Sequence, residues 1–376
     1  MWRSSYLIST TEFILSPRGE KLPEPIGPSS HFIPLKLRDL ATFLTMLLVI
    51  LDWVAGFLLA NIPFLKVRWN VKQMPKLNGR VAVVTGGNTG LGLVTSLELA
   101  RRGAKVYLAC RSETRARKAI EQIQDEVPSA QVEFVYFDLT VLSSAKTAAQ
   151  EISSKESRLD ILINNAGLYL TPYKLSADGI ELQACNGTGH FALTTHLLPL
   201  LKNADSTFSD SHVRIVNVAS HAHMDARQPD FSSLDALNGA TRTSAERYGY
   251  SKLTNILLTN ELQRRLNGTN IYCLSVHPGV VDTDIFKHFF QSCPSFFVPF
   301  GKSVLKWLGS TPREGALTQL FAATSPDIET KKLRAAYLAP YGRVARKSTI
   351  AEDPDGSLGL QFWTLCESLV EVSEDK

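Results

Sequence analysis

The most informative pair of residues in this sequence is Tyr248 and Lys252, because no other tyrosine is followed by a lysine four positions later. Residues 245–266 have the composition of a helix, so the two side chains should lie on one face, a turn apart. A free phenol has a pKa of about 10. A nearby ammonium and the positive ring of an oxidised nicotinamide cofactor would lower that pKa. The pair therefore predicts proton transfer to a carbonyl or from an alcohol, coupled to hydride transfer.

Two further polar residues are expected at the same site. Ser220 ends the apolar run 213–219, and a hydroxyl at the carboxyl end of a strand can hold a reacting oxygen in place. Asn186 is followed by Gly187 and Gly189, each unfavourable in a helix interior by about 1 kcal/mol. We expect a local bend there that frees Asn186 to hold a water molecule in a proton relay.

A glycine-rich turn predicts the cofactor site. The β-branched run 80–85 precedes three spaced glycines and a helical pattern over 93–102. Glycines at such a turn let the backbone approach a pyrophosphate, and the free N–H groups of the helix N-terminus attract its charge. The residues assigned to this loop are Gly86, Asn88, Gly90, Leu91 and Gly92.

The next predicted strand, 106–109, ends at Arg111 rather than at an acidic residue. An acidic side chain at this position usually binds the ribose 2′-hydroxyl of NAD, whereas an arginine accommodates the 2′-phosphate of NADP. NADP is therefore expected, and NAD is the less favoured alternative. Asp138 follows the third strand and could accept a hydrogen bond from the adenine amine. Asn165, Ala166 and Gly167 follow the fourth.

These residues can bind one cofactor only if parallel strands bring them to one edge of a sheet. Residues 78–345 alternate short β-rich runs with helical stretches, which predicts an α/β domain whose parallel sheet is covered on both faces. Residues 346–376 form a C-terminal tail with a short helix near 361–370. Residues 1–34 are a polar lead-in that contains several prolines.

Residues 35–65 contain a strongly apolar stretch, 40–60, which is long enough to span a bilayer. Asp52 near its centre would cost roughly 2.5–3.5 kcal/mol, which the surrounding aliphatic side chains offset. This composition fits a spanning helix, an amphipathic or hairpin anchor lying in one leaflet, or a helix docked on the domain. Basic residues are more frequent after the stretch than before it, which predicts a cytosolic domain.

The overall composition excludes several classes of protein. Apolar residues make up 44% and charged residues 20%, as in globular proteins. The net charge of +4 is spread along the chain, so nucleic-acid binding is not expected. His221 and His223 have no acidic or cysteine neighbour at metal-ligand spacing, so we expect no metal site.

Taken together, the motifs resemble those of the short-chain dehydrogenase/reductase family, in its branch similar to retinol dehydrogenases and WW-domain oxidoreductases. The matching segments are TGGNTGLG (85–92), RRGAKVYLACR (101–111), DL (138–139), NNAG (164–167), NGTGHF (186–191), RIVNVAS (214–220), YGYSKL (248–253) and HPGVVDT (277–283). The resemblance implies one Rossmann-type, doubly wound domain with about seven strands. The oligomeric state cannot be read from the sequence, and a homodimer remains open.

The resemblance also implies a role for each site residue. Tyr248 would be the proton donor or acceptor, and Lys252 would lower its pKa and hold the nicotinamide ribose. Ser220 would orient the substrate, Asn186 would serve the relay, and two residues would contact the nicotinamide amide. Those two residues are Val281 and Thr283.

Six phenylalanines and a tryptophan fall within residues 285–307, where the family places its substrate lid. This favours a lipophilic alcohol or carbonyl substrate of retinoid, sterol, terpenoid or fatty type, in a protein attached to the endoplasmic reticulum. The alternatives are a tailoring reductase or dehydrogenase of a specialised polyketide or terpenoid pathway, and a non-catalytic NADP-binding scaffold.

Overall fold

The computed structural model describes residues 69–209, 211–281 and 310–374, which fall in one compact unit. The lead-in 1–34, the apolar segment 35–65, Thr283 and the aromatic stretch 285–307 lie outside the described residues. Within the ranges described, no helix combines the length and the apolar character needed to cross a membrane.

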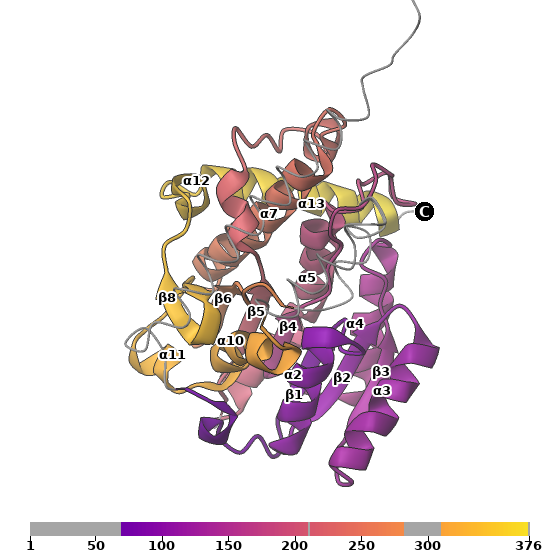
Figure 1. Cartoon of the computed structure of the whole chain (residues 1–376), viewed down its shortest axis with the longest axis vertical. Coiled ribbons are helices and arrows are strands. Elements are labelled where there is room, and N and C mark those ends of the chain that lie inside the picture. Colours follow the sequence, from indigo (N-terminus) through magenta and orange to yellow (C-terminus); the bar gives the residue numbers. More distant parts are fainter. Residues whose placement is uncertain (1–68, 210, 282–309, 375–376) are drawn as a thin grey trace, which may run out of the picture. The chain divides into compact units, whose positions relative to one another are not determined.

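A single sheet organises this unit, with the strand order β3-β2-β1-β4-β5-β6-β7-β8 (Figure 1). Neighbouring strands from β3 to β7 are parallel, whereas β8 pairs antiparallel with β7. The strands are β1 (Val81–Thr85), β2 (Lys105–Cys110), β3 (Val132–Tyr136), β4 (Ile161–Asn164), β5 (Arg214–Val218), β6 (Tyr272–Val276), β7 (Tyr337–Ala339) and β8 (Arg343–Ala345).

The predicted parallel α/β sheet is confirmed, with one antiparallel strand more than the seven expected. The short 3₁₀ turn η5 (Pro340–Gly342) joins β7 to β8. A connection this short can make a hairpin but cannot make the crossover that a parallel strand needs. Tyr341 and Gly342 both have positive φ, which reverses the chain direction within three residues.

Helices cover both faces of the sheet, as in a doubly wound fold. One hydrophobic core lies between the sheet and α2, α3 and α10, and the other between the sheet and α4, α5, α7 and α13. The helices are α2 (Gly90–Arg101), α3 (Glu113–Glu126), α4 (Ser143–Lys155), α5 (Cys185–Thr207), α6 (Leu234–Asn238), α7 (Ser244–Arg265), α10 (Pro312–Thr324), α11 (Asp327–Thr330), α12 (Thr349–Glu352) and α13 (Ser357–Glu374); two further 3₁₀ turns are η2 (Val71–Gln73) and η3 (His221–Asp225).

The central strands β1, β5 and β6 are buried at every position because helices pack on both of their faces. Their parallel direction brings the carboxyl ends of β1 to β5 to one edge. The segments that begin there contain the glycine-rich turn, Arg111, Asp138, Asn165 and Ser220. This edge therefore collects the polar residues singled out in the sequence.

The C-terminal tail packs on the same core as the sheet. Its helix α13 extends beyond residues 361–370 at both ends. The Trp363 ring lies edge-on to Phe191 of α5, with centroids 4.8 Å apart, and Phe362 lies 5.4 Å from Phe231. These large buried rings make α13 part of the hydrophobic core rather than a surface appendage.

Candidate active site

The glycine-rich turn between β1 and α2 leaves no room for side chains. Gly86 and Gly90 have positive φ, which favours glycine. A Cβ added to Gly92 would overlap the Gly86 carbonyl and lie 2.6 Å from Asn165 Nδ2. Thr89, the N-cap of α2, makes no side-chain capping bond, and it lines the cleft at this edge together with Gly90 and Leu91. This end of α2 can bind an anionic group through its backbone.

Thr85 joins the glycine-rich turn to the loop after β4. Its Oγ1 accepts hydrogen bonds from the backbone N–H groups of Asn165 and Ala166, both at 2.8 Å, and lies 2.9 Å from His190 Nε2. His190 Nδ1 lies 2.8 Å from the Asn186 carbonyl, which can only accept, so Nδ1 carries the proton and Nε2 accepts from Thr85. Burial lowers the pKa of His190 to about 3, which keeps the ring neutral.

The loops at this edge enclose a cleft of about 320 Å³. Most of the cofactor-binding residues predicted from the sequence line it: Gly86, Asn88, Gly90, Leu91, Arg111, Asp138, Asn165, Ala166 and Gly167. Gly92 lies behind the turn, against Gly86 and Asn165. The structure therefore brings together segments that are up to 80 residues apart in the sequence.

The outer end of the cleft is cationic. Arg111 and Arg115 are among its lining residues, and Asp138 is the carboxylate that accompanies them. Arg111 Nε lies 3.8 Å from Asp138 Oδ2, and the arginine side chain is 62% exposed. Asp138 Oδ1 also accepts hydrogen bonds from the N–H and hydroxyl groups of Thr140. The carboxylate is thus held at the end of β3, and the arginine remains accessible at the end of β2.

Ser220, Tyr248 and Lys252 meet at the inner end of this edge. The Ser220 side chain lies close enough to the Tyr248 hydroxyl to oppose the rise in its pKa. Lys252 Nζ lies 5.6 Å from the Tyr248 ring centroid and donates to the Val218 carbonyl at 2.8 Å. The Tyr169 ring, which follows the Asn165–Gly167 loop, packs edge-on against Tyr248, with centroids 4.6 Å apart.

The electrostatics of this group differ from the sequence-based expectation. The pKa of Tyr248 is raised above its usual value, mainly by burial and also by Tyr169, while the hydrogen bond from Ser220 opposes the shift. Burial also lowers the pKa of Lys252 to about 7. Desolvation dominates the pKa of Tyr248 among the protein's own groups. The predicted lowering of this pKa by the ammonium and the nicotinamide ring together stays a prediction. The phenol keeps its proton at neutral pH.

The predicted bend at Asn186 is also wrong, because α5 is continuous from Cys185. The two glycines instead allow close packing. A Cβ on Gly187 would overlap Thr254 Oγ1 of α7, and one on Gly189 would overlap the Leu139 carbonyl.

The Asn186 side chain braces a loop. Its Oδ1 accepts from Leu168 N at 2.8 Å, and its Nδ2 donates to Leu168 O and to Ser251 Oγ at 2.9 and 3.0 Å. Both amide N–H donors are therefore used by the protein. A water molecule at this side chain would have to bind at the second lone pair of Oδ1.

Val281 lies close to the glycine-rich turn. It is buried and bridges to Ser310 just before α10. A Cβ on Gly315 of α10 would meet both Val281 Cγ2 and Leu91 Cδ2, at 2.5 and 2.7 Å, so the two side chains flank the same point. Thr283, its predicted partner, is outside the described residues.

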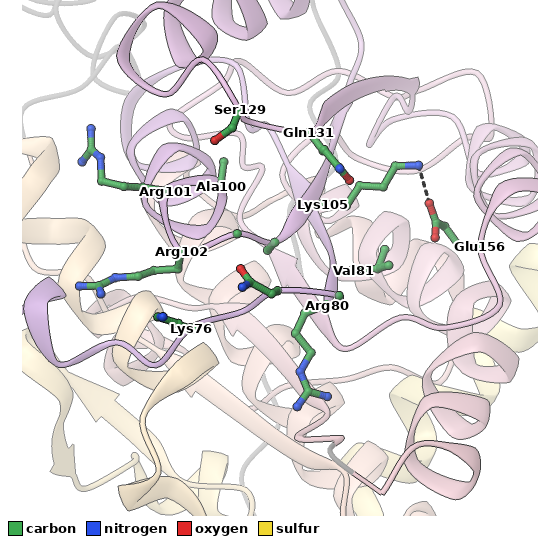
Figure 2. A pocket seen from close by; sticks show the side chains of 14 residues that line it. Lys76, Arg80, Val81, Ala100, Arg101, Arg102, Lys105, Ser129, Gln131 and Glu156 are labelled. Atoms are coloured by element: carbon green, nitrogen blue, oxygen red, sulfur yellow. Dashed lines mark ion pairs between the residues drawn. The ribbon is translucent and has the colours of Figure 1, made fainter.

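A larger hollow, of about 720 Å³, lies at the opposite edge of the sheet, at the amino ends of β1 and β2 (Figure 2). Two of its cations, Lys105 and Arg101, have acidic partners. Lys105 Nζ lies 2.7 Å from Glu156 and 2.9 Å from Glu133, and Arg101 pairs with Glu126 at 2.7 Å. Arg101 also complements the C-terminal dipole of α2. The predicted cofactor-binding residues named above line the smaller cleft and none of them lines this hollow, so we assign cofactor binding to the smaller cleft.

Comparison with known proteins agrees with this geometry. The family model for short chain dehydrogenases matches residues 80–293, which include both the glycine-rich turn and the Tyr248–Lys252 pair. The chain belongs to the short-chain dehydrogenase/reductase family.

Several known proteins align with most of this chain. An uncharacterised oxidoreductase of Schizosaccharomyces pombe is 41% identical over 72% of this chain and 79% of its own length. Retinol dehydrogenase 14 of Mus musculus is 34% identical over 79% and 87%. The crystal structure of an uncharacterised protein from Mycobacterium paratuberculosis matches with a TM-score of 0.60 and 32% identity over 81% and 97%. The resemblance to the retinol-dehydrogenase-like branch of the family is confirmed, and the protein is an oxidoreductase of alcohol and carbonyl groups.

Sequence analysis of this family member missed several buried polar residues, notably His190 and His223. His190 contacts Thr85, 105 residues away in sequence, and His223 contacts Ser348, 125 residues away. Only their closeness in sequence to predicted catalytic residues could have pointed to them. His190 lies a helical turn after Asn186, and His223 lies three residues after Ser220.

Proposed function

We propose that the protein is an NADP-dependent oxidoreductase that interconverts an alcohol and a carbonyl on a lipophilic small molecule, with Tyr248 as the proton donor or acceptor. The observation that carries the proposal is the meeting of Ser220, Tyr248 and Lys252 at the edge where the glycine-rich turn opens. We do not propose a nucleic-acid partner.

The residues present fit a dinucleotide. The cradle at Gly86 and Gly92 has no space for side chains, and the N-terminus of α2 offers N–H groups for a pyrophosphate. Arg111 and Arg115 lie where a 2′-phosphate would be bound, which favours NADP over NAD. Lys252 uses one N–H on Val218, and its remaining donors could hold ribose hydroxyls. When bound, the cofactor supplies or accepts the hydride.

The chain's own residues manage the proton. In the reductive direction, Ser220 orients the carbonyl oxygen and the Tyr248 phenol donates its proton to it. The raised pKa of Tyr248 keeps that proton in place until the oxygen becomes more basic. Lys252, when protonated, stabilises the phenolate that remains. The same residues act in reverse during oxidation of an alcohol.

Two observations support a lipophilic substrate at a membrane. Retinol dehydrogenase 14 is named for a lipophilic alcohol. The apolar stretch 40–60 and the basic residues after it suit attachment to the endoplasmic reticulum, with the domain in the cytosol. We include this attachment in the proposal.

The test is turnover by the full-length protein in detergent. We expect loss of NADPH absorbance with all-trans-retinal or nonanal, and much weaker turnover with NADH. Y248F should lose at least about a hundredfold in kcat, because it removes the general acid, while its affinity for NADPH is kept. A Y248F variant with wild-type kcat would refute the role of Tyr248. Faster turnover with NADH would refute the cofactor choice.

A further inference from the structure

The segment after the last strand, residues 346–353, is fixed to helix α7. Lys347 Nζ donates a hydrogen bond to Asn260 Oδ1 at 2.7 Å, and Asn260 Nδ2 donates to the Ala351 carbonyl at 2.9 Å. Asn260 is 4% exposed, and its bond to Ala351 is buried. Because α7 also carries Tyr248 and Lys252, the segment is anchored to the helix of the proposed catalytic pair.

The same segment reaches a second element of the active site through an imidazole. The Ser348 backbone N–H donates to His223 Nε2 at 3.1 Å, and His223 Nδ1 lies 2.7 Å from the Ser220 carbonyl. A backbone N–H can only donate and a carbonyl can only accept, so Nε2 is the acceptor and Nδ1 carries the hydrogen. A continuous hydrogen-bonded chain therefore runs from Ser348 to Ser220.

The imidazole is held in one orientation. His223 is 0% exposed, and its ring packs edge-on against Tyr337, with centroids 5.0 Å apart. Burial lowers the pKa of His223 below its usual value, although the hydrogen bond to Ser220 opposes the shift. The neutral ring can accept from Ser348 and donate to Ser220 at the same time, which a protonated ring cannot do.

The hydrogen bond from His223 holds Ser220, the residue that orients the substrate in the proposed function. Ser220 is the N-cap of η3, where its Oγ accepts from Ala222 N at 3.2 Å, and its side chain opposes the rise in the pKa of Tyr248. Its carbonyl accepts from both the backbone N–H and Nδ1 of His223. Fixing this carbonyl fixes the peptide plane after Ser220, and the bond from Ala222 N to Oγ then holds the hydroxyl on that backbone.

We propose that the C-terminal segment is a brace for the active site, in which the Ser348 N–H acts through His223 to set the position of Ser220 relative to Tyr248. Ser348 and His223 are positioning residues, since neither is placed to touch the reacting atoms. The inference rests on the proposed role of Ser220 in orienting the substrate.

The backbone donor can be removed selectively. Ser348 has φ −63°, which proline also adopts, so S348P deletes the N–H without forcing a new φ. S348A is the matched control, because both variants lose the hydroxyl that caps α12 but S348A keeps the N–H. With NADPH and nonanal, the kcat of S348P should fall about fivefold to tenfold below that of S348A, as expected for one hydrogen bond. The Kd for NADPH should be equal. Equal kcat values in the two variants would overturn the brace.

Two amide substitutions separate the two bonds of the imidazole. In H223N the amide nitrogen can replace Nδ1 and keep the bond to Ser220, whereas in H223Q the amide oxygen can replace Nε2 and keep the bond to Ser348. We expect H223N to retain more kcat than H223Q, even where both lose thermal stability. The reverse order, or equal kcat values at unequal stability, would contradict positioning through Ser220.

One readout needs no substrate, and so separates failure of the brace from failure of the proposed function. In the full chain with ¹⁵N-labelled histidine, NMR should show His223 as the neutral Nδ1–H tautomer, with its signal identified by its loss in H223N. Hydrogen exchange at Nδ1 should be faster in S348P than in S348A. An Nε2–H tautomer would overturn the brace. The predicted tautomer and exchange, without turnover of any carbonyl, would uphold the hydrogen-bonded chain and reject the proposed function instead.

Discussion

Lys252 illustrates how burial sets the chemistry of a single residue. It is 3% exposed, and its Nζ donates a hydrogen bond to the neutral carbonyl of Val218. Burial therefore lowers its pKa to about 7, so that its charge changes close to physiological pH. Its neighbour Tyr248 is shifted the other way by the same desolvation, since both groups are favoured in their neutral forms.

This lysine should give the free energy of unfolding a measurable pH dependence. The folded lysine loses its proton near pH 7, whereas the unfolded lysine holds it up to about pH 10.4. Between these values the unfolded state binds more protons, so Lys252 makes the wild type more stable as pH rises, by up to about 1.4 kcal/mol per pH unit.

The measurement is urea unfolding of the wild type and K252M between pH 7 and 8.5, without added cofactor. This range stays below the usual titration of phenols. The stability of the wild type relative to K252M should grow across the range. A constant difference would show that the folded lysine remains charged.

At the scale of helices, α5 can pack closely against α7 because Gly187 has no side chain. Alanine at position 187 would favour the helix by about 1 kcal/mol. It would also push a methyl group into Thr254 Oγ1 and Phe362, a kind of overpacking that costs about 1–3 kcal/mol. We expect G187A to lose up to about 2 kcal/mol of stability in chemical denaturation.

The matched background for that experiment is T254A, which removes the hydroxyl that the new methyl group would meet. G187A should cost less stability in T254A than in the wild type. A stabilising G187A would mean that the helices separate freely, and that the glycine has another purpose.

The elements also show what sequence patterns can and cannot predict. The residues of the cleft were predictable because parallel strands must end at one edge, which places Gly86, Arg111 and Asn165 together whatever the details of packing. The glycines after Asn186 were misread, because a missing side chain can permit either a bend or a close neighbour. Only the structure shows that neighbour, Thr254. Strand β8 was not expected, since three residues carry too little periodicity to identify.

At the scale of the whole molecule, attachment to a membrane is a prediction from composition that rests on residues 40–60. We expect the full-length chain to stay in the membrane pellet after alkaline carbonate extraction, because aliphatic side chains of this number favour the bilayer over water. A chain without residues 40–60 should be recovered in the supernatant. Full-length protein in the supernatant would refute an integral anchor.

The hydrogen-bonded brace from Ser348 has a consequence for the order in which the protein is made. Domains fold from the N-terminus as synthesis proceeds, so the glycine-rich turn and the Ser220–Tyr248 pair emerge first. The residue that steadies Ser220 comes near the end of the chain, and α13 follows it. A nascent chain can therefore bind its cofactor before its catalytic frame is complete. Full competence should come only once Ser348 has docked on His223, which ties the onset of activity to a contact 125 residues apart in the sequence.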